Sequence, residues 1–337
     1  MGPRRSSPGC AGVAVLLLTL ALGWVLRPGA ARAFAGGEEG GWSLQASFRS
    51  LGGIWIAGEK LPAPGGEDTA VEDPDRASSF GQQLGRLEWT GQPTATFGYE
   101  LHLLQALATR TGTASPSAGA GGLPVAPRRY RALDLSWQPL DERQSSISSV
   151  VDRASVRLSL GPADVTLGRQ AISFGHAFFW NPTDIFLAFD PQQVDQEYKP
   201  GVDALRLDLA LGDFSGLSLI AVTGEALDMQ GERVGNGRLQ VSSYGSALVA
   251  RAHTSLSSWA LSLQAGAVHG GFQAGGGFTT DLLGLDLRGE FTFYQPRSAT
   301  RAQEHGFDGA LSPRALRAVV GLGYRFESSL QLRTAYF

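Results

Sequence analysis

Residues 202–211 read VDALRLDLAL, a stretch in which apolar residues alternate with small or charged ones. Successive side chains of an extended chain point to opposite sides, so residues two apart share a face. One face is formed by four leucines: Leu205, Leu207, Leu209 and Leu211. The opposite face carries small and charged residues: Ala204, Arg206, Asp208 and Ala210. The stretch therefore predicts a β-strand with one apolar and one polar face.

The same alternation recurs along the chain, and no helical spacing of apolar residues follows residue 33. Fourteen segments are candidate strands: 42–51, 84–90, 94–106, 130–138, 151–160, 163–171, 202–211, 215–223, 240–253, 259–269, 272–282, 285–294, 315–326 and 329–337. The sequence therefore predicts an all-β fold.

Composition excludes several classes of protein. The chain has 337 residues, of which 43% are hydrophobic and 18% are charged. This much apolar surface excludes a disordered chain, and a single Cys excludes an internal disulfide scaffold. Only one apolar run, 13–26, approaches the length of a membrane-spanning helix, which excludes a helical membrane bundle.

Residues 1–33 have the organisation of a secretory signal peptide. Two arginines precede the apolar run 13–26, and an A-x-A cleavage site follows it at residues 31–33. Cleavage after Ala33 would remove four arginines and shift the formal net charge by four units, from −3 to −7. The alternative is an uncleaved membrane anchor. We therefore predict an exported chain whose β-domain occupies residues 34–337.

Two architectures contain many alternating strands: a soluble sandwich or barrel, and a transmembrane barrel. Segments of about ten residues match a tilted strand across a bilayer, whereas soluble strands more often have five or six residues. Aromatic residues lie near segment ends, as in the interfacial girdles of membrane barrels: Trp42, Trp89, Trp137, Trp259, Tyr294, Tyr324, Phe326 and Tyr336. We therefore predict a transmembrane antiparallel β-barrel of about 14 strands, within a range of about 12–16.

Two neighbouring segments, LGRQAISFG at 167–175 and FWNPTDIF at 179–186, resemble a GRQ…FG…WNPTD signature of porin-like outer-membrane barrels. The resemblance implies a Gram-negative outer-membrane protein, exported through the periplasm and surrounded by membrane lipid and lipopolysaccharide. It also implies passive diffusion of small solutes, and it leaves open whether copies of the chain form a homo-oligomer. The chain end departs from the usual pattern, because Leu332 and Tyr336 fall on the face opposite Phe337.

Turn lengths give the strands a direction. Short turns on one side of a membrane barrel alternate with longer loops on the other, and long loops are expected at 172–201, 224–239 and 295–314. By this alternation the last segment, 329–337, runs outward, whereas a complete barrel ends at the periplasmic side. Either the segment 130–138 belongs to a long loop and the strand count differs, or the chain is truncated at its C-terminus and lacks a closing strand.

The polar face of the predicted strands is rich in arginine. Alternation places these residues inward: Arg153, Arg157, Arg206, Asp208, Arg251, His253, Arg288, Glu290, Arg317, Arg325 and Arg333. Arginines on a channel wall attract anions, which predicts a weak preference for anionic solutes. The alternative is a filled barrel in which the arginines pair with inward carboxylates and nothing passes.

The long loop 172–201 is rich in aromatic residues and is the predicted constriction. A loop of this composition is expected to leave water by folding into the barrel. The candidate constriction residues are Arg169, Gln170, Trp180, Asn181, Asp184 and Asp190, with the acidic ones facing the wall arginines. Alternation points Gln170 inward and Arg169 outward, unless a bulge at Gly168 turns Arg169 inward. The alternative is a structural loop that seals one end.

Catalytic chemistry has weak support in the sequence. The one local cluster is His176 with Ser173 and Asp184, and no G-x-S-x-G motif surrounds it. Zinc-type spacing, a phosphate loop and a basic aromatic stripe are all missing. We therefore predict no enzyme, no cofactor, no metal and no nucleic-acid partner. A porin-like channel is the leading prediction, with a non-conducting structural or assembly barrel and a barrel-embedded hydrolase as alternatives.

Overall fold

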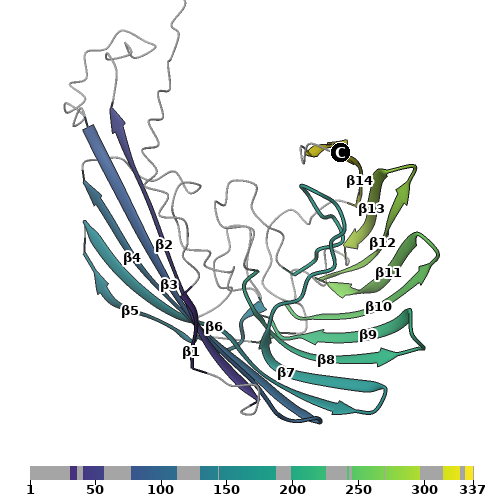
Figure 1. Ribbon diagram of the computed structural model, residues 1–337, viewed down its shortest axis with the longest axis horizontal. Helices are drawn as coiled ribbons and strands as arrows, with labels where there is room; N and C mark the ends of the chain where they lie inside the picture. The colour runs from purple at the N-terminus through teal and green to yellow at the C-terminus, as the bar shows by residue number, and fades with distance from the viewer. Residues whose placement is uncertain are drawn as a thin grey trace, which may run out of the picture.

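The computed structural model describes residues 31–35, 41–56, 77–111, 130–142, 144–186, 199–224, 241–242, 245–268, 270–296, 314–326 and 331–336. The strands among them form one antiparallel sheet (Figure 1). They are β1 (Ala31–Ala35), β2 (Trp42–Ile56), β3 (Ala77–Thr94), β4 (Phe97–Thr111), β5 (Ser136–Asp141), β6 (Ser145–Leu160), β7 (Ala163–Gln170), β8 (Val202–Ala210), β9 (Ser215–Val222), β10 (Ala247–Leu256), β11 (Trp259–Val268), β12 (Gly271–Leu282), β13 (Leu285–Pro296), β14 (Ala315–Arg325) and β15 (Gln331–Tyr336).

Fourteen of these strands follow one another across the sheet in chain order, which confirms the predicted all-β, antiparallel fold class and strand number. One predicted member is wrong. The segment 130–138 does not enter this path, because the strand there is β5, which lies off the path and pairs with β6. The remaining place is taken by β1, which pairs with β2 through Ala31 and Ala35.

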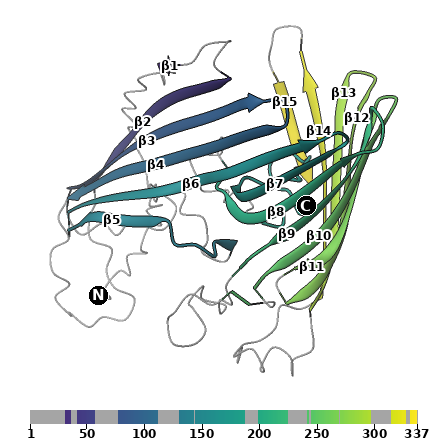
Figure 2. The same cartoon turned by 90° about the horizontal axis from the view of Figure 1, so that it is seen from below.

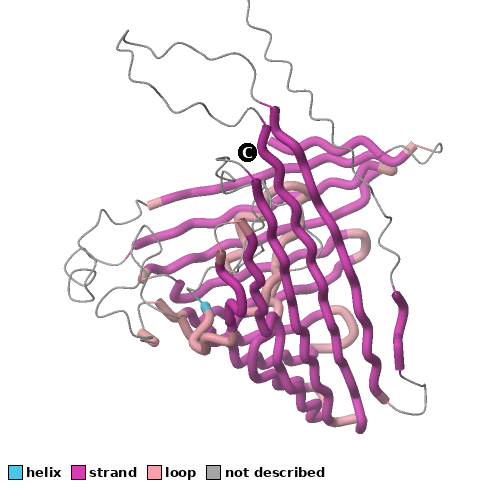
Figure 3. Tube along the Cα trace, turned by 90° about the vertical axis from the view of Figure 1, so that its left-hand side faces the viewer, coloured by secondary structure: helices cyan, strands magenta, loops and turns pink. Residues whose placement is uncertain are grey.

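The sheet curves into a trough (Figures 1 and 2). The long strands β2–β6 form one side, and β8–β14 form the other (Figure 1). Figure 3 shows neighbouring strands running side by side along the wall. Among the described strands, β1 and β15 lie at the two edges and do not pair with each other, so the sheet is not closed.

The two faces of the sheet differ in chemistry, as strand alternation requires. On the outer face large apolar side chains are exposed, including Leu205 and Leu263, which is 65% exposed. Their neighbours in sequence, Ala204 and Gln264, face inward and are buried. Within the described ranges, no helix has the length and apolar character needed to cross a membrane.

One end of the sheet has tight turns. Gly161, Gly212 and Gly284 lie in these turns with φ of 67°, 94° and 80°, a conformation that glycine adopts without a Cβ clash. We call this end the turn end, and the opposite end, where β7 connects to β8, the loop end. The last strand, β15, runs from the turn end to the loop end.

Candidate functional site

Residues 171–186, which we call the strap, leave the sheet after β7 and cross its inner face. The strap contacts side chains of β10, β11 and β13, and it lies inside the trough (Figure 1). Together with residues 199–201 it makes up the described part of the loop predicted at 172–201. Residues 187–198 of that loop, including the predicted constriction residue Asp190, lie outside the described residues.

An apolar cluster fixes the base of the strap. Ile172, Phe174 and Phe186 are buried against Tyr130 and against inner-face residues of the wall. The wall residues are Val202, Ala204, Ile220, Val222, Ala247, Val249 and Val268. Phe186 packs edge-on against Tyr130, with ring centroids 5.3 Å apart. Burial of each large apolar side chain contributes about 1.5–3 kcal/mol to stability. These contacts therefore hold the base of the strap against an apolar part of the wall.

Glu290 of β13 holds the middle of the strap. Its carboxylate is buried and accepts every hydrogen bond that it makes from the strap. Oε1 accepts from the backbone N–H of His176 and from that of Ala177, at 2.7 Å for Ala177. Oε2 accepts from the N–H and the hydroxyl of Thr183, at 3.1 and 2.6 Å. A buried donor left without an acceptor costs about 1–3 kcal/mol, so this carboxylate fixes the position of the strap.

The ring of His176 joins the strap to β10 and β11. The guanidinium of Arg251 donates to Nε2 at 3.0 Å, and the hydroxyl of Ser262 lies 3.2 Å from the same atom. Because a guanidinium can only donate, Nε2 is an acceptor and the imidazole is neutral. Burial, followed by the charge of Arg251, lowers the pKa of His176 from its ordinary value of 6.5.

Acid is therefore expected to loosen the strap. The undocked imidazole binds a proton at about pH 6.5, whereas the docked one binds it only at lower pH, so the contribution of His176 to docking is complete above pH 6.5 and is lost as pH falls through the lowered value. Arg251 and His253 of β10 and Arg288 of β13 face the ring and oppose its charge, and Glu290 favours it.

Recordings of single-channel current between pH 7.5 and 4.5 test this expectation. If the chain conducts, current noise should rise as the pH falls below 6.5 in the unsubstituted protein and stay flat in His176→Gln. The control His253→Gln removes a neighbouring histidine that makes no hydrogen bond to the strap and should retain the rise. An equal rise in His176→Gln would contradict the role of His176.

Asp184, which is predicted to face the wall arginines, pairs with Lys199, and its charge also acts on Arg251 of the wall. Its carboxylate is buried in an ion pair with the ammonium of Lys199, and the hydroxyl of Ser173 donates to it at 3.4 Å. Burial raises the pKa of Asp184 and lowers the pKa of Lys199, and each charge opposes the shift of its partner. The pair therefore pins the end of the strap, where Asp184 N–H also donates to the carbonyl of Asn181 at 3.0 Å.

Trp180 and Asn181 complete the strap residues that the sequence predicts for the constriction. Asn181 packs closely on Gly175, where an added Cβ would lie 2.3 Å from Asn181 Cγ. Trp180 is partly buried within the same segment. Both residues therefore belong to the turn of the strap, and their role toward a solute stays a prediction.

Arg169 and Gln170 at the end of β7 are both buried. Gly168 has φ of 118°, and the register is unbroken there, with Arg169 opposite Ala154 and Asp203. Arg169 donates to Asp203 at 2.7 Å and to the carbonyl of Val151 at 3.0 Å. Gln170 donates to the carbonyls of Thr166 and Ala204, both at 3.2 Å. Both side chains therefore fix the point where the chain leaves the sheet.

Three wall arginines on the inner face are paired with carboxylates. Arg153 contacts Glu100 at 2.9 Å, Arg206 contacts Asp208 at 2.7 Å, and Arg288 contacts Asp286 at 2.6 Å. In the part of the chain that the structure describes, five others lack an ion pair: Arg157, Arg251, Arg317, Arg325 and Arg333. The described part of the wall therefore contains both arginines without an ion pair and arginines paired with carboxylates, the two alternatives that the sequence leaves open. A role of these residues in transport stays a prediction.

A buried ion network on β3 and β6 is not foreseen from the sequence. Asp152 accepts from Arg86 at 3.1 Å and from Arg131 at 3.0 Å. Alternation would turn Asp152 outward if Arg153 faces inward. The register between β4 and β6 shifts at this point, with Val151 rather than Asp152 opposite Leu103. The bulge turns both charged residues inward, and period-two reasoning cannot detect it.

The cluster that a hydrolase would need is only partly assembled. Ser173 and Asp184 are in contact, whereas the ring of His176 contacts Ser262 and Arg251. Among the described residues, no group of three or more His, Cys, Asp or Glu side chains is arranged to hold a metal ion.

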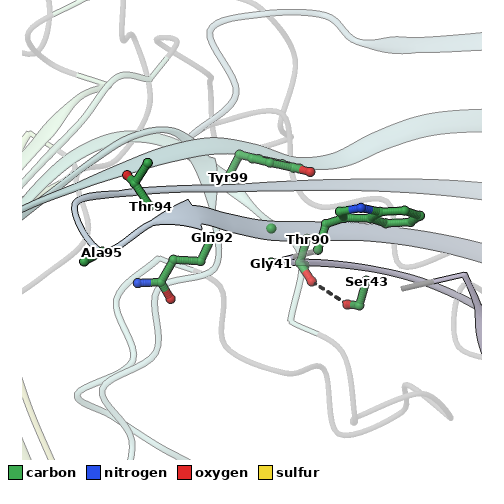
Figure 4. Close-up of a pocket in the computed structure, with 9 residues that line it drawn as sticks. Gly41, Ser43, Thr90, Gln92, Thr94, Ala95 and Tyr99 are labelled. Carbon is green, nitrogen blue, oxygen red and sulfur yellow. Dashed lines mark hydrogen bonds between the residues drawn. The ribbon is translucent and has the colours of Figure 1, made fainter. Parts of the chain in front are cut away.

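A separate hollow of about 610 Å³ lies at the turn end of β2–β4 (Figure 4). It is lined by uncharged residues: Gly41, Trp42, Ser43, Thr90, Gly91, Gln92, Thr94, Ala95 and Tyr99. Gly91 lies between Trp42 and Tyr99 in the register, and a Cβ at Gly91 would lie 2.5 Å from the Tyr99 ring. The hydroxyls of Ser43 and Thr90 are 2.9 Å apart. The aromatic rim is typical of an interfacial girdle, and no lining residue belongs to the strap.

Comparison with known proteins gives matches among solved structures, whereas no family model and no curated protein matches the chain. Salmonella typhi OmpF in complex with daunomycin has 9% identity and a TM-score of 0.43, over 88% of this chain and 78% of that one. Pseudomonas putida OprB at high pH has 12% identity and a TM-score of 0.41, over 86% and 72%. A mutant of the Rh. blastica porin has 10% identity and a TM-score of 0.33, over 87% and 93%. Likenesses at such TM-scores carry no weight for function.

Proposed function

We propose that the chain is an outer-membrane channel of a Gram-negative bacterium through which small solutes diffuse passively. One observation carries the proposal. The same strands present exposed apolar side chains on the outer face and polar or charged side chains on the inner face, which the strap crosses. A face of exposed leucines and phenylalanines is unfavourable in water, whereas a sheet with these two faces suits a barrel wall between lipid and a water-filled lumen.

The edges of the sheet are compatible with closure in a membrane. Strands in lipid must satisfy every backbone hydrogen bond, and β1 and β15 run in opposite directions, so antiparallel pairing between them would complete the wall. The proposed signal peptide, residues 1–33, would end inside β1. N-terminal sequencing of the mature chain determines whether β1 or β2 forms the edge. Assembly of several identical chains also stays a prediction.

The inner wall supports a weak preference for anions. Arg157, Arg317 and Arg325 lack a carboxylate partner within the described residues, whereas the charges of Arg206 and Arg288 are balanced by Asp208 and Asp286. Unbalanced guanidinium groups on a lumen wall raise the local anion concentration. Because only part of the arginine charge is unbalanced, the preference is expected to be small.

Planar-bilayer recording of the purified, folded full chain tests the proposal. The expected result is stepwise current, with a reversal potential in a KCl gradient that shows a modest excess of chloride flux. The variant Arg317→Gln with Arg325→Gln should shift the reversal potential toward potassium and leave the steps in place. A folded protein that gives no steps at any voltage would contradict the channel.

A non-conducting structural barrel is the second candidate. The ion network of Asp152 with Arg86 and Arg131, together with the strap, fills part of the inner face with paired charges and apolar side chains. A barrel filled in this way would be rigid and closed to solutes. The bilayer recording separates the two candidates, because only the channel produces current.

A further inference from the structure

The aromatic ring of Phe178, in the strap, occupies a slot formed by β13, β14 and β15. The guanidinium carbon of Arg288 lies 4.4 Å from the centre of the ring, and that of Arg333 lies 5.1 Å from it. A guanidinium group over an aromatic face is attracted by the negative charge of the π-system. The slot therefore holds a flat ring between two cations.

Two glycines make the floor of this slot. A Cβ added at Gly321 would lie 2.9 Å from Cδ2 of Phe178, and a Cβ added at Gly323 would lie 2.9 Å from Cζ. These glycines face inward, opposite Arg288 and Asp286 of β13. Any other residue at either position would occupy the space of the ring. The shape of the slot is therefore that of a planar ring, and its width is set by the backbone of β14.

The charge of the slot is positive and only partly balanced. Arg288 is paired with Asp286 at 2.6 Å and donates to the carbonyl of His176 at 3.2 Å. Arg333 donates to the neutral amide oxygen of Gln331 at 3.0 Å and has no carboxylate partner among the described residues. Arg333 is exposed, so an anion on the inner side of the sheet can reach its guanidinium group.

We propose that this slot is a subsite for planar aromatic carboxylates, in which the ligand ring takes the place of the Phe178 ring and its carboxylate pairs with Arg333. The subsite rests on the proposed channel function and names a class of solute for it. The strap supplies an internal occupant, so an aromatic solute and Phe178 compete for the same space. Aliphatic anions of equal charge lack the flat ring that the glycine floor and the guanidinium faces select.

Calorimetric titration of the detergent-solubilised full chain with benzoate tests the subsite. Benzoate should bind more tightly than cyclohexanecarboxylate, which has the same charge without a flat ring, and more tightly than benzamide, which has the ring without the charge. Phe178→Ala removes the competing ring and should tighten benzoate binding about fivefold. Phe179→Ala is the matched control, because Phe179 is the adjacent aromatic residue, is 58% exposed, and should leave binding unchanged.

A second variant keeps the test independent of the fold of the strap. Arg333→Gln removes an exposed charge and should weaken benzoate binding about tenfold, the loss expected for one charge-assisted hydrogen bond. Equal binding of benzoate and cyclohexanecarboxylate, or no effect of either Phe178→Ala or Arg333→Gln, would overturn the subsite. Absence of current in the bilayer with benzoate binding intact would overturn the channel and leave the subsite standing, so the two failures are distinguishable.

Discussion

Replacing Glu290 by Gln is expected to release the strap and increase single-channel conductance roughly twofold. The amide keeps one oxygen acceptor but places an NH₂ group where the second carboxylate oxygen was. The N–H and the hydroxyl of Thr183, or the N–H groups of His176 and Ala177, then face a donor instead of an acceptor. Because the Thr183 hydroxyl can rotate to accept from the amide, at least one buried N–H is left without an acceptor, at a cost of about 1–3 kcal/mol, which favours movement of the strap away from the wall.

Conductance and liposome swelling with sugars of increasing size measure the release. The variant should admit larger sugars as well as carry more current, because the strap would narrow the passage of the proposed channel. Asp208→Asn is the control: it removes one negative charge from the inner face, and its partners Arg206 and Ser218 lie on β8 and β9 rather than on the strap. If both variants change conductance equally, charge rather than strap position is responsible, and the anchoring role of Glu290 is wrong.

Replacing Leu263 by Arg is expected to lower the free energy of unfolding in a bilayer by a large amount. Leu263 is 65% exposed on the outer face and lies midway along β11. In a bilayer this position faces hydrocarbon near the midplane, where arginine in a membrane barrel costs about 2–4 kcal/mol. Urea unfolding in lipid vesicles, followed by tryptophan fluorescence, measures the change in the free energy of unfolding.

The matched control places the same residue on the inner face of the neighbouring strand. His253 of β10 is exposed, and it pairs in register with Ser262, the residue that precedes Leu263. His253→Arg should change the free energy of unfolding by less than about 1 kcal/mol, because lumen-facing positions tolerate charge. Equal costs for the two variants would mean that the two faces meet the same solvent, and the membrane orientation would then be wrong.

The sequence predicts the strands well and the site only in outline. Stretches such as 202–211 and 259–268 fix both the strand and its apolar face, because side-chain alternation depends on consecutive residues alone. The strap region also stands out before folding, since a long loop so rich in aromatic residues is expected to leave water. Local composition does not reveal where such a loop attaches. The sequence points to Asp184 but does not reveal that Lys199 pairs with it in the folded chain.

A backbone irregularity accounts for another difference. The bulge near Asp152 turns a charged residue inward against the alternation. A bulge adds one residue to one strand of a pair, and its position depends on the partner strand as well as on the sequence around it. The placement of β5 beside β6 also depends on a partner strand. It requires β7 to end early and leave part of the edge of β6 free.

By itself, then, the sequence determined an all-β chain whose strands each carry one apolar and one polar face, and it singled out the long aromatic loop that contains the strap. Only the tertiary structure decided that Glu290 anchors the strap, because the carboxylate and the backbone of His176 are 114 positions apart in the chain. The two faces follow from the alternation of side chains along an extended backbone, which every strand shares. The anchoring by Glu290 depends instead on folding, which brings groups that are distant in sequence together in a buried place. There an unpaired donor or charge is too costly to persist.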